Sequence, residues 1–173
     1  VYRYEMILEV LHLKRIFSVF LSLALAVSLF QAALAEESAG MDRGALAQRL
    51  AELCGYADEL EGYAAQPSAF SDVAEEDECR AAVNLLRDKG LMQGDGSGAF
   101  RPSVPATRAD AVTVLLRWAG LTEAQIGAYG SYDSACLMAS LGLSGDLAGG
   151  IKDEGELTDL YETVKPLYDA LHA

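Results

Sequence analysis

An internal repeat constrains the fold of this 173-residue chain more than any other feature of its sequence. Two segments align with small gaps, and in each a glycine-rich stretch leads to a threonine that opens an apolar helical pattern. One segment runs from Gly90 to Thr107, and the other runs from Gly142 to Thr158. A partial copy of the last element begins at Met41. Such repetition predicts a fold in which similar units pack against one another.

The central copy predicts two helices joined by a loop. From Asp77 to Lys89, apolar residues recur at helical spacing, and Gly90 supplies a left-handed stop. Turn-forming residues follow, and prolines keep the chain extended up to Thr107. Thr107 suits an N-cap, with Asp110 three residues later as in a capping box. No long run alternates with period two, so the chain is predicted to be all-α and without a sheet.

The flanking copies are expected to carry matching capped helices. Asp42 can cap a helix that ends near Gly55, and Thr158 can cap a third helix. The acidic residues between positions 153 and 156 are then expected to lie scattered in the chain before that third helix.

The first 35 residues follow the three-part pattern of a secretory signal peptide. Lys14 and Arg15 are basic, residues 16–30 form an uncharged apolar run, and Ala33-Leu34-Ala35 is a small-x-small cleavage site. The apolar run is shorter than the roughly 20 residues of a membrane span, with an uncleaved anchor as the alternative. Residues 1–13, which precede the basic pair, are expected to reflect a misplaced start and are given no structural role.

Charge and composition exclude several classes of function. Residues 36–173 hold 10 basic and 24 acidic side chains, a formal net charge of −14. This acidity argues against nucleic acid and against an anionic membrane surface as partners. The two histidines, His12 and His172, lie in the leader and next to the last residue, which argues against histidine-based catalysis and a histidine-rich zinc site. We therefore expect no enzyme activity, no metal and no cofactor.

Cys54, Cys79 and Cys136 all lie in apolar, helical-looking surroundings. Three cysteines allow at most one internal disulfide and leave one thiol over. We expect them to be buried small hydrophobic residues, with a single bridge as the alternative. Without a CxxC pair, their spacing does not indicate a metal site.

The central copy resembles the S-layer homology (SLH) domain. The residues that carry this resemblance are Phe70-Ser71-Asp72-Val73, Ala82-Val83 with Leu86, Gly90-Leu91, Gly94, Phe100 with Pro102, and Thr107-Arg108-Ala109-Asp110. They match the family pattern F-x-D-V, A-I-x-x-L, G-I, G, F-x-P and T-R-A-E in order. In weaker form the resemblance covers residues 41–173, divided into a partial repeat (41–66), a full repeat (67–121) and a degenerate repeat (122–173).

The resemblance implies an all-helical bundle of three copies around a pseudo-threefold axis. It also implies non-covalent binding of a cell-wall polysaccharide, typically a pyruvylated secondary wall polymer, in grooves between the copies. By motif position, Arg43 and Arg108 would contact the acidic groups of the ligand. Gly94 and Gly145 would line the grooves, where the lack of a side chain lets the sugar approach closely.

The chemistry of arginine suits this role. A planar guanidinium binds a carboxylate bidentately, and the dipole and unused N–H groups of a helix start also favour an anion. Arg108 has a second interpretation, as a solvated residue of the first helical turn or as an ion-pair partner of an acid in the next copy. In the third copy Asp159 stands where the arginine is expected, and Lys152 is the candidate substitute. One or two working grooves are therefore expected.

Three features outside the motif have candidate roles. Trp118 falls inside a predicted helix and is expected in the core, with a carbohydrate platform as the alternative. Tyr129 and Tyr132 are candidate loop residues for sugar stacking. The loop at 95–98 faintly resembles a calcium loop but lacks the closing glutamate, so a structural turn is expected.

The sequence thus predicts a secreted, non-catalytic module that anchors at the cell surface, in the cell wall or S-layer, by binding a wall polysaccharide. It is not expected to contact the membrane after signal cleavage. One alternative is a degenerate scaffold that contacts another envelope protein. Another is the N-terminal fragment of a larger surface protein.

Overall fold

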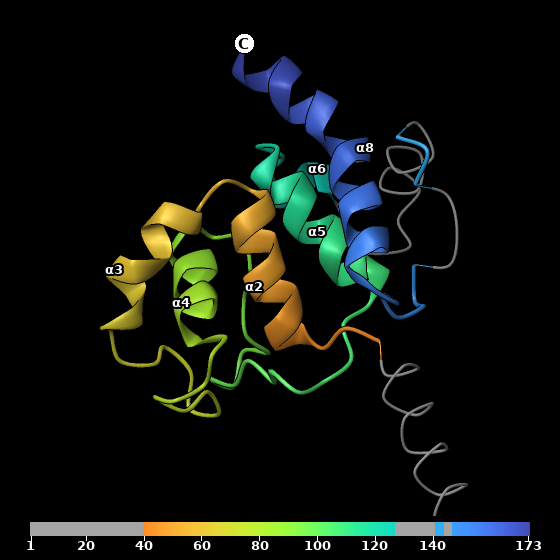
Figure 1. Cartoon of the computed structure of the whole chain (residues 1–173). Coiled ribbons are helices and arrows are strands. Elements are labelled where there is room, and N and C mark those ends of the chain that lie inside the picture. Colours follow the sequence, from red (N-terminus) through yellow and green to blue (C-terminus); the bar gives the residue numbers. More distant parts are fainter. Residues whose placement is uncertain (1–39, 127–140, 144–146) are drawn as a thin grey trace, which may run out of the picture. The chain divides into compact units, whose positions relative to one another are not determined.

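The computed structural model describes residues 40–126, 141–143 and 147–173 (Figure 1). This described part is mostly helical and has two isolated bridges but no β-strand, which confirms the all-α prediction. Several predictions concern residues outside the described part, namely the signal peptide (1–35), Tyr129, Tyr132, Cys136 and Gly145.

The helices pack around α2 and α5 (Figure 1). Within residues 40–173, α4 packs against α2 and α3, while α8 packs against α5 and α2. In chain order the described helices are α2 (Arg43–Leu53), the 3-10 turn η1 (Ala57–Glu59), α3 (Leu60–Ala64), α4 (Arg80–Asp88), α5 (Arg108–Trp118), α6 (Glu123–Ile126) and α8 (Glu154–His172).

Caps and glycines set the helix ends largely as predicted. The carboxylate of Asp42 caps α2 and accepts from the Ala45 N–H at 2.8 Å. Thr107 and Asp110 form the predicted capping box at the start of α5. Helix α4 begins at Arg80, three residues after its predicted start. The glycines that follow the helices with positive φ are Gly55, Gly90 and Gly120, with φ values of +84°, +71° and +94°.

A single hydrophobic core lies between these helices. The apolar residues predicted for the inner faces of α4 and α5 are buried. Trp118 is buried, and its ring stacks on that of Tyr168 of α8 with 4.0 Å between centroids, which confirms the core prediction. Cys54 and Cys79 are buried free thiols, as expected for small hydrophobic residues. Burial raises the pKa of Cys54 to about 12.

Three backbone hydrogen bonds close a ring just ahead of α2, α5 and α8. The Met41 N–H donates to the Ile151 carbonyl at 2.8 Å, and the Ile151 N–H donates to the Ala106 carbonyl at 3.1 Å. The Ala106 N–H completes the ring by donating to the Met41 carbonyl at 2.9 Å. Ala106 and Ile151 are fully buried, so the ring satisfies backbone groups that water does not reach. The pseudo-threefold bundle stays a prediction.

The third capped helix begins earlier than predicted. Asp153, not Thr158, caps α8, because its carboxylate accepts from the Glu156 N–H at 2.8 Å. Thr158 lies inside α8, where its hydroxyl donates to the Glu154 carbonyl. The acids that we expected to be scattered before the helix are therefore its cap and first turn, where negative charge is favourable. The prediction was wrong because it aligned threonine with threonine, although aspartate caps a helix equally well.

Candidate functional site

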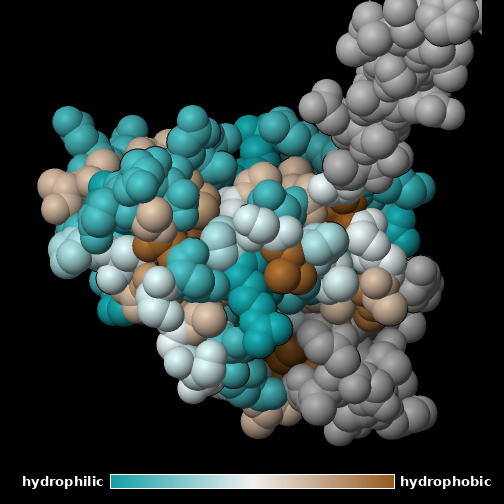
Figure 2. Space-filling model, turned by 90° about the horizontal axis from the view of Figure 1, so that it is seen from below, coloured by the Kyte–Doolittle hydropathy of each residue, from teal (hydrophilic) through white to brown (hydrophobic). Residues whose placement is uncertain are grey.

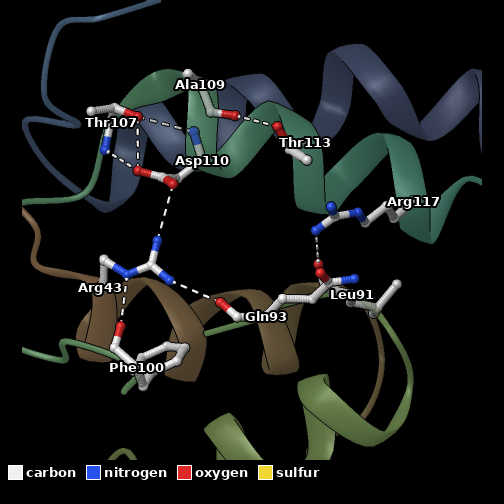
Figure 3. Close-up of polar contacts among 9 residues, drawn as sticks. All are labelled: Arg43, Leu91, Gln93, Phe100, Thr107, Ala109, Asp110, Thr113 and Arg117. Carbon is white, nitrogen blue, oxygen red and sulfur yellow. Dashed lines mark hydrogen bonds and ion pairs between the residues drawn. The ribbon is translucent and has the colours of Figure 1, made fainter. Parts of the chain in front are cut away.

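Arg43 connects α2 to the central copy through all three nitrogens of its guanidinium (Figure 3). Nη1 donates to the Asp110 carboxylate on α5 at 3.0 Å. Nη2 donates to the Gln93 carbonyl at 3.2 Å, and Nε donates to the Phe100 carbonyl at 3.1 Å. The guanidinium also lies over the Phe100 ring, 4.9 Å from its centroid. With its side chain 17% exposed, Arg43 is a structural element of this junction.

Asp110 serves two purposes at the same junction. Its Oδ1 accepts from Arg43, while its Oδ2 accepts from the Thr107 N–H at 2.9 Å and the Thr107 hydroxyl at 2.8 Å. One carboxylate therefore completes the cap of α5 and holds the arginine of the preceding helix.

Arg108 repeats this arrangement at the next junction. It forms an ion pair with Oε1 of Glu156 on α8, which is the second interpretation that the sequence left open for this residue. Oε2 of Glu156 accepts from the backbone N–H of Lys152 at 2.8 Å. Burial acts to raise the pKa of Glu156, but the hydrogen bonds from Lys152 and Arg108 outweigh it and lower the pKa. The Lys152 residue itself is exposed.

The junction between α8 and α2 carries the opposite charges. In α8 the first helical position, held by Arg43 in α2 and Arg108 in α5, is Glu154. Its carboxylate lies 3.5 Å from Nε of Arg49. Asp159 is an exposed residue well inside α8, so its predicted place at the arginine position was wrong. The conclusion that an acid occupies this position in the third copy holds through Glu154.

The first N–H groups of α2 and α5 are already used. The Arg43 and Arg108 N–H groups donate to the carbonyls of Val104 and Gly149, both at 2.9 Å. The next residues, Gly44 and Ala109, donate to carbonyls of the same two loops. These helix starts were expected to offer unused N–H groups to an anion. The structure corrects this, because loop carbonyls of the following copy accept those bonds.

A pocket of about 570 Å³ lies beside Arg43 at the first junction. This volume falls within the range of small-ligand sites, roughly 300–1,000 Å³. Three arginines and two aspartates line it, so its side chains carry a net positive charge in a chain of formal net charge −13. The apolar part of its lining includes Met92, Val104, Pro105 and Val114.

Of the predicted site residues, the structure brings Arg43 and Gly94 together in this pocket. The missing side chain of Gly94 serves loop packing. A Cβ there would lie 2.6 Å from the Ala99 carbonyl oxygen and 2.7 Å from the Phe70 ring. Arg108 and Lys152 lie together at the second junction, through Glu156.

Sequence reasoning did not single out Arg101 and Arg117, which line the same pocket. Arg117 lies in the last turn of α5, where its Nη1 donates to the Leu91 carbonyl at 3.0 Å (Figure 3). Its Nε donates to Glu123 at 2.6 Å. Arg101 is the variable residue of the F-x-P motif. Its position next to Phe100 within that motif is the sequence signal that could have pointed to it.

The loop at 95–98 forms the predicted structural turn. The Asp95 N–H donates to the Ala99 carbonyl at 2.9 Å, and Oδ1 of Asp95 accepts from the Ser97 hydroxyl and N–H. The hydrogen bonds from Ser97 and the ion pair with Arg101 lower the pKa of Asp95 to about 2. Asp95 is therefore a charged residue of the pocket rim at any ordinary pH.

On the face of the molecule seen in Figure 2, hydrophilic residues cover much of the described surface, and hydrophobic residues form small, separate patches. This pattern is typical of a surface that faces solvent. In the described ranges, none of the helices has the length and apolar character needed to cross a membrane.

Comparison with known proteins found one family match, which lies in the central copy. Residues 69–112 match the family model of the S-layer homology domain. No match was found among curated proteins or among solved structures. SLH domains are in general non-catalytic modules that bind the cell wall, and they indicate association with the cell surface. The matched stretch holds α4, the pocket loop and the start of α5.

Proposed function

We propose that the chain attaches non-covalently to an anionic polysaccharide of the bacterial cell wall through the pocket at the first junction. The observation that carries this proposal is the excess of arginines in that pocket, within a chain whose overall charge is strongly negative. The SLH match supports it, because it covers the pocket loop from Met92 to Pro105.

The lining of the pocket suits a sugar that carries a pyruvyl ketal. Such a ketal presents a carboxylate and a methyl group on the same carbon. Arginine binds the carboxylate through a planar pair of N–H groups and keeps its charge at any physiological pH. Val104 and Pro105 offer an apolar wall to the methyl group, and the Val104 residue is 44% exposed. We therefore favour a pyruvylated wall polymer as the ligand.

A second groove is proposed at the junction of α5 and α8. Arg108 and Lys152 supply its cations, and Gly145 its close approach. Three copies at 41–66, 67–121 and 122–173 would then form the pseudo-threefold bundle, which the closed ring of Met41, Ala106 and Ile151 supports. The acid Glu154 at the third position argues against a third groove of the same kind.

The predicted signal peptide at residues 1–35 would bring the protein to the cell surface. There the wall polymer is the partner, and neither nucleic acid nor the membrane is needed for anchoring.

Sedimentation with wall sacculi tests the proposal. The secreted protein should pellet with intact sacculi and stay in the supernatant after the wall polymer has been chemically stripped. Arg108→Ala, run in parallel, should reduce pelleting if the second groove contributes. Equal pelleting with stripped and intact sacculi would contradict polymer binding.

A second candidate function is a scaffold that contacts another envelope protein. It is favoured by the occupation of both motif arginines, since Arg43 and Arg108 are each paired with an acid of the chain itself. Capture of one defined envelope protein by the immobilised chain, unchanged after enzymatic removal of wall glycan, would support this function over polymer binding.

A further inference from the structure

Arg101 has a backbone conformation that the chain otherwise gives to glycine. Among the described residues, every other position with positive φ is a glycine, while Arg101 has φ +62°. An L-residue pays a steric cost in this region that glycine does not pay. Pro102 follows, and a proline disfavours anything but extended backbone in the residue before it. The strain at Arg101 is therefore a reason to look for a role of its side chain.

Asp72 of the F-x-D-V motif holds this conformation in place. Its two carboxylate oxygens accept from the N–H groups of Phe100 and Arg101, both at 2.7 Å. Two charge-assisted hydrogen bonds to successive N–H groups fix the direction in which the Arg101 side chain leaves the loop.

The three pocket arginines differ in how firmly they are held. Arg43 and Arg117 both have side chains 17% exposed, and both donate to backbone carbonyls. Arg101 is 62% exposed and is paired with Asp95, to which its Nε and Nη2 lie at 2.9 and 2.7 Å. An ion pair on the surface is weak, because water solvates both partners. A carboxylate from a ligand can therefore replace Asp95 at Arg101 more easily than it can displace a backbone carbonyl.

We propose that Arg101 is the residue that binds the anionic group of the ligand in this pocket, while Arg43 and Arg117 shape the pocket and hold it positive. The exchange needs no change of fold, since the Arg101 side chain only turns from Asp95 to the ligand carboxylate. This inference rests on the proposed function in taking the wall polymer as the natural ligand, and it assigns the recognition to a residue outside the T-R-A-E motif.

Arg101→Gly separates this role from a structural one. Glycine relieves the backbone strain, so the urea midpoint of unfolding should stay equal to that of the wild type or rise. Binding to wall sacculi should fall at least tenfold, and Arg101→Lys should retain part of it, because lysine keeps the charge but not the planar fork. Arg87→Gln is the matched control, since Arg87 is an exposed arginine paired with Asp88 outside the pocket, and it should bind within twofold of the wild type.

A defined probe separates anion binding at Arg101 from binding of the whole wall polymer. The secreted protein would be titrated with a methyl hexoside that carries a pyruvyl ketal, and with the methyl ester of the same compound. The free acid should shift the Arg101 side-chain N–H signals in the NMR spectrum, and the ester should not.

Together, the sacculus and probe experiments test the Arg101 assignment and the wall-binding function separately. If the wild type binds sacculi and Arg101→Gly binds equally well, the assignment of Arg101 is overturned while wall binding stands. If the probe binds at Arg101 but sacculi do not, the wall-binding function fails and the anion site stands. If neither binds, both proposals are wrong.

Discussion

Two junctions between helices differ in their side chains but not in the kind of backbone contact that joins them. One lies between α2 and α5, the other lies between α8 and α2, and each contains one hydrogen bond of the backbone ring. In the first, the Ala106 N–H reaches the Met41 carbonyl at 2.9 Å; in the second, the Met41 N–H reaches the Ile151 carbonyl at 2.8 Å. At the first junction, Arg43 at the start of α2 forms an ion pair with Asp110 of α5. At the second junction the charges are reversed, because the acid Glu154 stands at the start of α8 and lies near Arg49 of α2.

This difference shows that backbone and side chains carry separate tasks. The backbone ring sets how the capped helices meet, and it tolerates either sign of charge at the first helical position. The side chains decide where a positively charged pocket forms, because at the first junction they place Arg43 beside Arg101 and Arg117. A helix can therefore keep its place beside the ring with either an arginine or an acid at its first position.

Asp110→Ala should have the largest effect on the first junction. It removes the Asp110 side-chain half of the α5 capping box, although the Thr107 hydroxyl can still accept from the backbone N–H at position 110, and it leaves the mostly buried guanidinium of Arg43 without its carboxylate. We expect the free energy of unfolding to fall by about 2–4 kcal/mol in urea titrations. Asp88→Ala, which breaks an exposed pair at the end of α4, is the control and should cost under about 0.5 kcal/mol. Equal losses in the two variants would contradict the double role of Asp110.

Glu156→Gln should have a smaller effect at the second junction, about 1–2 kcal/mol, because Asp153 still caps α8. Combination with Arg108→Gln should show a coupling energy of at least about 0.5 kcal/mol in a double-mutant cycle. Strict additivity of the two changes would show that the pair contributes nothing to the junction.

Acid should weaken the first junction through its loop. The folded protein holds the pKa of Asp95 at about 2, below its ordinary value of 3.8, so the unfolded chain binds a proton first as the pH falls. The stability that Asp95 contributes is complete above about pH 4 and is lost between pH 4 and 2. The pKa of Glu156 is also lowered, which adds to the loss in the acid range. Urea midpoints measured from pH 7 to pH 2 should show this decline, and Ser97→Ala should make it shallower. A slope that Ser97→Ala leaves unchanged would rule out the Asp95 contribution.

Glu154→Arg should have the smallest effect on stability. It gives the third copy the residue of the other two, but it places a cation near Arg49 and at a helix start, each unfavourable by a few tenths of a kcal/mol. We expect a loss under about 1 kcal/mol and no gain in sacculus binding, with Glu154→Gln as the control. A clear gain in binding would show that the first helical position alone creates a groove.

Local features were predictable from the sequence. Thr107 and Asp42 cap their helices, Gly90 ends α4, and Trp118 is buried, because each depends on residues a few positions away or on helical spacing. The start of α8 was missed, since Asp153 and Thr158 both fit a cap and only the packed structure shows which one meets the ring through Ile151.

The candidate site depended on contacts between distant parts of the chain. Arg43 and Gly94 were identified by motif position, but the acceptors of Arg43 lie 50, 57 and 67 residues away in the chain, and no spacing rule connects them. The conformation of Arg101 is set by Asp72, which is 29 residues distant. The sequence by itself therefore determined the all-α class, the caps of α2 and α5 and the likeness of the central copy to the SLH family. The tertiary structure decided which arginines of the pocket are held by backbone carbonyls and which one is exposed, because burial and pairing arise only when distant parts of the chain pack against one another.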